Sequence, residues 1–229
     1  MSDSSYESAD LYFVTTSARK VAGLRHYQEA EYQSRKALTS LVWMQPSIKA
    51  VDLQDPPLME IQDADVRNVS VDKARQAFLR VKQPVLVEDG GLYIHTLKGF
   101  PGAYTKYVME TIGPQGLLKL MEDQPDRSCT FRSCLVYIDH HTFEQPLVFE
   151  STTNHGSLAL QLGTSDTSGS IPFEPLFKLF IPTASGFDRP LSQFTPEEWN
   201  EYRRVRAPDS PMAMFSTWWF DTHFLSEKP

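Results

Sequence analysis

The chain has 229 residues, enough for one large domain or two small ones with a substantial hydrophobic core. Hydrophobic residues make up 41% of it and charged residues 22%, which is ordinary for a soluble globular protein and excludes disorder along the whole chain. The formal net charge of −7 argues against a nucleic-acid polymer as partner, because such binding depends on lysines and arginines that neutralise phosphates.

The N-terminal segment, residues 1–10, is polar and acidic, and we expect it to be a disordered lead-in rather than a signal or transit peptide. No apolar run approaches the ~20 residues that a bilayer-spanning helix needs. We therefore expect a cytoplasmic protein without a membrane partner, with access to the nucleus left open. Cys129 and Cys134 are expected to be reduced thiols, as is usual in that compartment.

The first third of the chain alternates between strand and helix patterns. Leu11–Val14 is a short apolar run, which predicts a strand that leads into a loop. Residues 20–38 have helical character, and a second strand is expected within residues 41–51. Apolar residues at helical spacing predict a further helix over Val66–Val81.

The middle of the chain contains the clearest buried strand, residues 84–87, which we expect to stop at the acidic and glycine-rich residues 88–91. Residues 104–121 predict a mostly helical segment. Residues 129–138 and 146–152 have the pattern of two strands joined by a short polar connection, so we expect an antiparallel hairpin.

The last part of the chain predicts a short strand over residues 177–181 and a helix over Pro196–Arg206, for which Thr195 is the expected N-cap. The tail, residues 208–229, is rich in aromatic residues and is expected to pack on the core or on a partner. This order of elements predicts an α/β or α+β fold with a mixed sheet, and we assign residues 11–229 to one domain.

The strongest chemical signal is the pair Glu88-Asp89, which we expect at the carboxyl end of a buried strand, where open α/β sheets bind ligands. Neighbouring side chains on a strand point to opposite faces, so one of the two acids can face a site while the other makes a structural bond. The alternative is an ordinary strand that ends in a polar turn. Glu60 is a third acid, and a lone glutamate of this kind is more often a surface residue.

The loop after the first strand, Thr15-Thr16-Ser17-Ala18-Arg19-Lys20, combines hydroxyl groups with two cations at a predicted helix start. Free backbone N–H groups and the helix dipole make such a place a natural anion site. It is not a Walker A loop, because the glycines are missing. The alternative is a capped surface helix with solvated cations.

Taken together, these residues resemble the Ham1, or inosine triphosphate pyrophosphatase, family. The segment VLVEDGGLYIHTLKGFPGAYTKYVMETIGPQGLLKL resembles the family's acid-rich strand end, its G-(L/F)-P-G-x-Y motif and its lysine. FVTTSARK is similar to the family's V-T-x-N-x-x-K opening, and Glu60-Ile61-Gln62 to its E-(I/L)-Q element. The resemblance is ordered from Leu11 to Leu120 and continues more weakly to about Ala207.

The resemblance implies an elongated mixed sheet flanked by helices, in two lobes with a cleft between them. It implies a homodimer that uses Mg²⁺, with Mn²⁺ as a substitute, to split noncanonical purine nucleoside triphosphates into monophosphate and pyrophosphate. It also implies site residues: Asp89, Glu88 and Lys20 for catalysis; Glu60 and Asp89 for the metal; and Thr15, Ser17, Lys20, Lys73, Lys106, Phe173, Glu174 and Arg204 for the substrate.

The C-terminal half departs from the family pattern. Its F-G-(W/Y)-D-P element appears as residues 171–175, so that Phe173 is expected to stack on a base and Glu174 to act as an acceptor. In the family's K-N-x-x-S-H-R element, Tyr202 replaces the serine and Arg203 the histidine, and Arg204 alone keeps its type. Because that element reads the purine, base selectivity is the feature that these departures affect most.

Three functional interpretations stay open at this stage. The first is an active pyrophosphatase with altered base choice, which the retained Lys20, Glu60, Asp89 and Lys106 favour. The second is a family member used for another phosphate or nucleotide reaction in a biosynthetic pathway. The third is a nucleotide-binding or scaffold protein with weak catalysis, and the lost Ser-His pair favours the last two.

Overall fold

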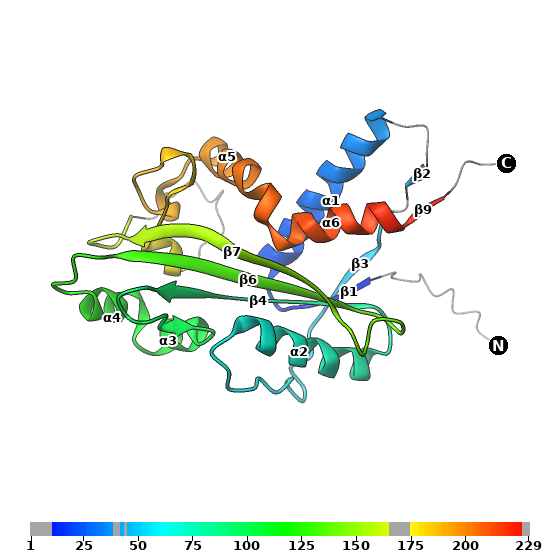
Figure 1. Cartoon of the computed structure of the whole chain (residues 1–229), viewed down its shortest axis with the longest axis horizontal. Coiled ribbons are helices and arrows are strands. Elements are labelled where there is room, and N and C mark those ends of the chain that lie inside the picture. The colour runs from blue at the N-terminus through cyan, green and yellow to red at the C-terminus, as the bar shows by residue number, and fades with distance from the viewer. Residues whose placement is uncertain (1–10, 39–41, 44, 165–174, 226–229) are drawn as a thin grey trace.

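The computed structural model describes residues 11–38, 42–43, 45–164 and 175–225 (Figure 1). Its main sheet follows the order β3 (Ile48–Val51), β1 (Leu11–Val14), β4 (Val85–Ile94), β6 (Ser128–Ile138), β7 (Leu147–Leu158) and β8 (Phe180–Pro182), with the short β5 (Pro101–Gly102) paired to β4. A separate pair joins β2 (Val42–Trp43) to β9 (Phe224–Leu225).

The sheet is mixed, as the sequence predicts. β1 runs parallel to both β3 and β4, whereas β4, β6, β7 and β8 are antiparallel to their neighbours in turn. The parallel part comes from the alternating strands and helices of the first third, and the antiparallel part from the long hairpin that follows. The mixed α/β class is therefore confirmed.

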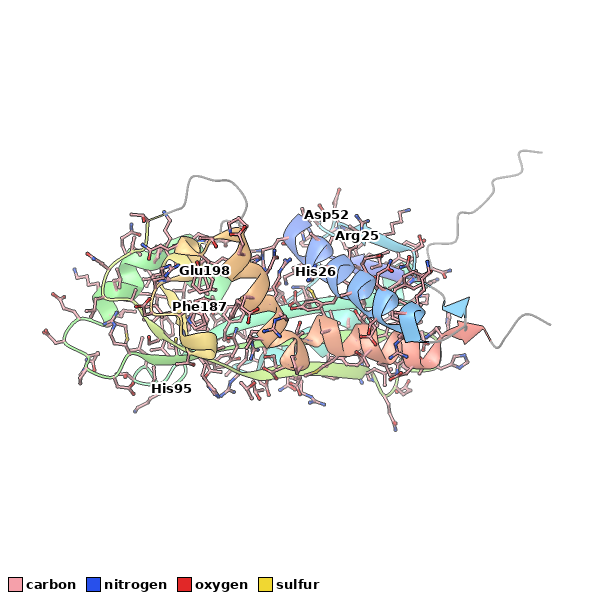
Figure 2. The ribbon with its side chains drawn as sticks, turned by 90° about the horizontal axis from the view of Figure 1, so that it is seen from above. Arg25, His26, Asp52, His95, Phe187 and Glu198 are labelled. Atoms are coloured by element: carbon pink, nitrogen blue, oxygen red, sulfur yellow. The ribbon has the colours of Figure 1, made fainter. Side chains whose placement is uncertain are left out.

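Helices cover both faces of the sheet (Figure 1). On one face lie α1 (Ala18–Leu38), α5 (Pro196–Arg206) and α6 (Pro211–Thr222), and on the other lies α2 (Val66–Val81), with α3 (Thr105–Thr111) and α4 (Gly113–Leu120) near one end. Seen from above, α1 and α6 lie side by side, and α5, which carries Glu198, lies beyond them (Figure 2). Four 3₁₀ helices complete the described part: η1 (Pro175–Lys178), η2 (Ala184–Gly186), η3 (Leu191–Gln193) and η4 (Ala207–Asp209).

Alternation along β4 divides the core between the two faces of the sheet. Leu86 belongs to the cluster under α1 and α6, whereas Val85 and Val87 belong to the cluster under α2. A third cluster fills the end of the molecule near α4 and η1, around Leu92 and Ile94. Because alternate residues of a strand face opposite sides, the two acids that follow Val87, Glu88 and Asp89, also face opposite sides of the sheet.

The prediction that the central strand stops at Glu88-Asp89-Gly90-Gly91 is wrong. β4 continues through these residues to Ile94, paired along this length with β6. A Cβ atom on Gly91 would lie 2.1 Å from the carbonyl oxygen of Gly102, so the glycine allows the backbone of β5 to approach β4. The glycines thus mark a close backbone contact, not a turn.

Other predicted elements are close to the observed ones. Helices over Val66–Val81 and Pro196–Arg206 are confirmed, and the hairpin is confirmed with a second strand that extends to Leu158. The strand predicted over residues 177–181 is wrong in part, because Phe177 lies in η1 and the strand begins at Phe180.

The aromatic tail packs on the core, which confirms one of its two predicted locations. Phe215, Trp219 and Phe220 of α6 are buried in the cluster that contains β1 and α1 residues. Cys129 and Cys134 are buried free thiols, and burial raises the pKa of each to about 12. Among the residues that the structure describes, no helix is long and apolar enough to cross a membrane.

Candidate active site

The candidate site lies where one edge of β4 lacks a neighbouring strand within the described part of the chain. β1 pairs with β4 only up to Leu86, and β5 begins to pair at Leu92. Between these two points the edge of β4 carries Glu88 and Asp89, and the loop that follows β1 runs beside it. Ligands bind at the carboxyl ends of parallel strands in such sheets. Here the strand that ends at the site is β1, whereas its neighbour β4 continues past it.

The loop after β1 is shaped by its own hydroxyl groups. The backbone N–H of Ser17 donates to Oγ1 of Thr15 at 3.0 Å, and Oγ of Ser17 accepts from the backbone N–H of Lys20 at 3.4 Å. Ser17 therefore caps the first turn of α1. This cap fixes the helix start, so the side chain of Lys20 projects toward β4.

Lys20 joins the helix start to the strand. Its Nζ donates to the backbone carbonyl of Glu88 at 2.5 Å and lies 3.3 Å from Oε2 of the same residue. The Glu88 side chain is largely buried, at 14% exposure, and Oε2 has the Lys20 charge nearby without a well-directed hydrogen bond. The resemblance assigned Glu88 to catalysis, and the structure gives its side chain Lys20 as a partner.

Asp89 lies on the other face of β4 and meets α2. Nζ of Lys73 lies 3.1 Å from Oδ2 and 3.3 Å from Oδ1 of Asp89, and it donates to Oε1 of Glu60 at 2.6 Å. Glu60 comes from the loop before α2, so three separate elements bring these groups together. The two carboxylates predicted as metal ligands therefore share a single cation.

The charges in this cluster stabilise one another. The hydrogen bond from Lys73 holds the pKa of Glu60 below its ordinary value, with further help from the charges of Lys106 and Lys20. Burial acts to lower the pKa of Lys73, but the charge of Asp89 and the hydrogen bond to Glu60 outweigh it, and its pKa is raised. Glu60 and Lys73 are thus both ionised at neutral pH.

The oxygen donors present suit a Mg²⁺ ion shared with a substrate. Mg²⁺ prefers oxygen ligands, keeps several waters, and is usually held by one or two carboxylates together with substrate phosphates. Glu60 and Asp89 already hold the ammonium group of Lys73 between them, so the two carboxylates bind a positive charge at the position expected for the metal ion. Within the described residues, no group of three or more His, Cys, Asp or Glu side chains could hold a metal by itself.

A cavity of about 590 Å³ opens beside the acidic and basic residues, which is within the usual size range of small-molecule sites. One end is lined by Lys20, Glu88, Asp89 and Lys106. The rest is lined mainly by aromatic and apolar side chains from η1, η3, β6, β8 and α5, including Phe131, Phe177, Phe180, Leu176, Leu191 and Trp199. The cavity thus has a charged end and an apolar end.

Helix α5 presents one face to the cavity. Trp199, Tyr202 and Arg206 lie at positions i, i+3 and i+7, and all three line it. The hydroxyl of Tyr202 and the side-chain amide of Asn154 on β7 exchange hydrogen bonds at 2.9 and 3.1 Å. Burial raises the pKa of Tyr202, so the phenol is neutral and can donate or accept there.

Arg206 lines the cavity, and Arg204 does not. Arg206 donates to Oγ of Ser151 at 2.8 Å and pairs with Asp209 at 2.7 Å. Arg204 is 74% exposed and pairs with its helix neighbour Glu201. The structure thus places Arg204, predicted to bind the substrate, outside the cavity lining, because helical geometry turns it outward.

The other predicted site residues fall into three pairs. Lys73 and Glu60 lie against Asp89, next to the cavity, whereas Thr15 and Ser17 shape the loop that positions Lys20. Phe173 and Glu174, predicted to contact the base, lie outside the described residues.

Arg19, one of the two cations of the predicted anion site, lines the cavity. Several other cavity residues escaped the sequence analysis: Tyr27, Asn154, Phe177, Trp199 and Arg206. A signal was available for α5 alone, because Trp199, Tyr202 and Arg206 fall on one helical face. No pattern in the sequence indicates that β7 and η1 contribute, since only the packing of the sheet brings them to this place.

Comparison with known proteins supports a relationship along most of the chain. The model of the Ham1 family matches residues 11–207. The dITP/XTP pyrophosphatase of Thermococcus kodakarensis is 34% identical over 159 residues, which cover 69% of this chain and 78% of that protein. The dITP/XTP pyrophosphatase of Hyperthermus butylicus is 35% identical over 144 residues, which cover 63% of this chain and 70% of that protein.

Solved structures share the fold. A HAM1 protein from Coxiella burnetii superposes with a TM-score of 0.69 at 16% identity, covering 93% of this chain and 98% of its own. The Ham1 protein of Staphylococcus aureus gives a TM-score of 0.65 at 14% identity, covering 91% of this chain and 97% of its own. At such low identity these two structures establish the fold alone.

Proposed function

Because the chain belongs to the Ham1 family, as its sequence motifs indicate, we propose that it hydrolyses noncanonical purine nucleoside triphosphates to the monophosphate and pyrophosphate. The relatives named dITP/XTP pyrophosphatase support this activity. The observation that carries the proposal is the arrangement of the cavity: Lys20, Lys106, Glu88 and Asp89 line an aromatic pocket. Outside this lining, Lys73 bonds Asp89 and Glu60.

The charged end suits the triphosphate. Lys20 and Lys106 line the cavity itself, and Lys73 lies directly behind Asp89. A triphosphate brings several negative charges, and these amines offset the charge that builds on the leaving pyrophosphate. The capped start of α1 holds Lys20 on a rigid element, which keeps its position independent of the substrate.

Glu60 and Asp89 would hold Mg²⁺, or Mn²⁺ in its place, and the bound ion would polarise a phosphoryl oxygen and acidify water. The lowered pKa of Glu60 keeps this carboxylate ionised, which suits a metal ligand. Asp89 lines the cavity and is the carboxylate placed to orient the attacking water and accept its proton. Glu88 fixes Lys20 and so positions a phosphate contact.

The apolar end suits a purine base. Phe177 and Trp199 lie with ring centroids 5.6 Å apart and both line the cavity, so they offer aromatic surface for a flat ligand. Asn154 and Arg206 add polar groups to the lining of the same cavity. An arginine has only donors, so Arg206 favours bases with keto oxygens over bases that present amino groups.

The proposal is tested by incubating the purified chain with ITP, dITP, XTP and the four standard ribonucleotides, with Mg²⁺ or with EDTA, and measuring pyrophosphate. We expect pyrophosphate release from ITP, dITP and XTP, with loss of release in EDTA. If no nucleotide on the panel releases pyrophosphate, the result would instead support a family member that binds a nucleotide without hydrolysing it or catalyses another phosphate reaction.

A homodimer completes the proposal, because the family resemblance implies it, and the cytoplasmic location stays a prediction from the sequence. Sedimentation equilibrium distinguishes a dimer from the 26.1 kDa monomer. A single species at the monomer mass, at micromolar concentration, would remove the dimer from the proposal and leave the activity standing.

A further inference from the structure

The ammonium group of Lys73 occupies the space between the two carboxylates assigned to the metal. Its Nζ makes three contacts with their oxygens, at 2.6 Å to Glu60 and at 3.1 and 3.3 Å to Asp89. The Lys73 side chain is only 20% exposed, so the cation is held inside the cluster and not at its rim.

We propose that Lys73 is a built-in counter-cation that competes with the divalent metal for Glu60 and Asp89. In this arrangement the lysine holds the metal position in the resting protein and leaves it when the metal arrives. The inference rests on the proposed function for the assignment of the two carboxylates, and it adds a second role to a residue expected only to contact phosphate.

The physical reason is the repulsion between two carboxylates that share a partly buried position. Without a cation between them, the two negative charges would repel each other at short range. Lysine suits the task, because its ammonium has three donors that can serve several oxygens and sits on a flexible four-carbon stem that can move away. Asp89 is 23% exposed and Glu60 55%, so both groups remain accessible to an incoming ion.

The other two lysines of the site have different positions. Lys20 is bound to the carbonyl and carboxylate of Glu88, and Lys106 lines the cavity and acts on Glu60 by charge alone. Only Lys73, among the lysines that the structure describes, bonds both Glu60 and Asp89. Competition for the metal position is therefore specific to Lys73, and Lys106 serves as a matched control for the loss of one positive charge.

Such competition links metal binding to phosphate binding. Displacement from the carboxylates frees the Lys73 ammonium beside a cavity end already lined by Lys20 and Lys106. A polyanion stabilises the displaced lysine, so each ligand should favour the other through this side chain. The resting protein alone should bind the metal weakly.

The experiment measures Mn²⁺ binding by electron paramagnetic resonance to the full chain without nucleotide, for wild type, Lys73→Met and Lys106→Met. Methionine keeps an unbranched side chain and removes the charge. We expect Lys73→Met to bind Mn²⁺ at least about tenfold more tightly than wild type, because a competitor at contact distance is gone, and Lys106→Met to gain less than about threefold.

Thermal unfolding with and without Mn²⁺ guards against misfolding of the variant. Lys73→Met should start less stable than wild type, since its carboxylates lose their partner, and should gain more from Mn²⁺ than wild type does. The inference is overturned if Lys73→Met binds Mn²⁺ no more tightly than wild type or does not bind it at all. It is also overturned if the increase in Mn²⁺ affinity is no larger in Lys73→Met than in Lys106→Met.

These outcomes are separate from those of the pyrophosphatase assay, because no nucleotide is present. Tighter Mn²⁺ binding by Lys73→Met in a chain that hydrolyses nothing would keep the inference and reject the function. Hydrolysis by wild type without any difference between the lysine variants would do the reverse.

Discussion

Asp89 is the residue on which the chemistry of the site depends most. It lines the cavity, faces Lys73 and, with Glu60, frames a cation. We predict that Asp89→Asn lowers kcat by roughly 100-fold or more, in keeping with the loss of a positioned proton acceptor. The unfolding midpoint should change little, because Lys73 keeps its bond to Glu60. Steady-state assays beside Asp123→Asn, an exposed acid outside the cavity, provide the check, and full activity of Asp89→Asn would reject its assigned role.

The two arginines at the end of α5 offer a matched pair. Arg206 faces the cavity and bonds Ser151 and Asp209, whereas Arg204 is exposed. We predict that Arg206→Met lowers kcat/KM for keto purine triphosphates by at least about tenfold, the scale of a lost charged hydrogen bond. Arg204→Met should leave kcat/KM unchanged within about twofold, as expected for an exposed pair. A larger loss of kcat/KM in Arg204→Met than in Arg206→Met would support the family resemblance, which assigned substrate binding to Arg204.

At the scale of elements, α5 is held by a capping box that fixes where its cavity face begins. Oγ1 of Thr195 accepts from the backbone N–H of Glu198, and the Glu198 carboxylate accepts from the backbone N–H of Thr195. We predict that Thr195→Ala lowers the free energy of unfolding by about 1 kcal/mol, and that Thr195→Ser retains it. Urea denaturation measures both. Equal stability of the alanine and serine variants would mean that packing alone sets the start of α5.

The edge of β4 shows how several elements divide one task. β1 ends before Glu88 and β5 begins after Gly91, so the strand offers its acids to α1 on one face and to α2 on the other. The same two neighbouring acids thereby hold two different lysines. A change in the length of β1 or in the position of β5 would close this gap and cover the site.

On the scale of the whole molecule, the C-terminal helix completes the core beneath the N-terminal helix. Phe215 is fully buried against Tyr137 and Phe149 of the hairpin, while α6 packs along α1. We predict that Phe215→Ala lowers the free energy of unfolding by about 3–5 kcal/mol, the usual cost of such a cavity. Tyr107→Ala, at a side chain 67% exposed, is the control and should cost less than about 1 kcal/mol. Denaturation curves that coincide for the two variants would show that α6 does not belong to the folding core.

The sequence by itself determined the local features of this protein. The apolar periodicity of Val66–Val81, the cap at Thr195 and the strand–loop–helix start at Ser17 are all decided within a few residues, so each is visible in the sequence. Motif order indicated the family, whose model matches residues 11–207, and with it Lys20, Glu60, Asp89 and Lys106.

Only the tertiary structure decided which groups meet. Gly91 was interpreted as part of a turn, because the close approach of Gly102 comes from a residue eleven positions later and cannot be inferred from the glycine itself. The choice of Arg206 over Arg204 depends on how α5 is rotated against β7, and the cation shared by Glu60 and Asp89 depends on three elements packing together. Local sequence determines where a helix or strand begins and which conformation it takes, whereas contacts between distant elements depend on burial of the whole core.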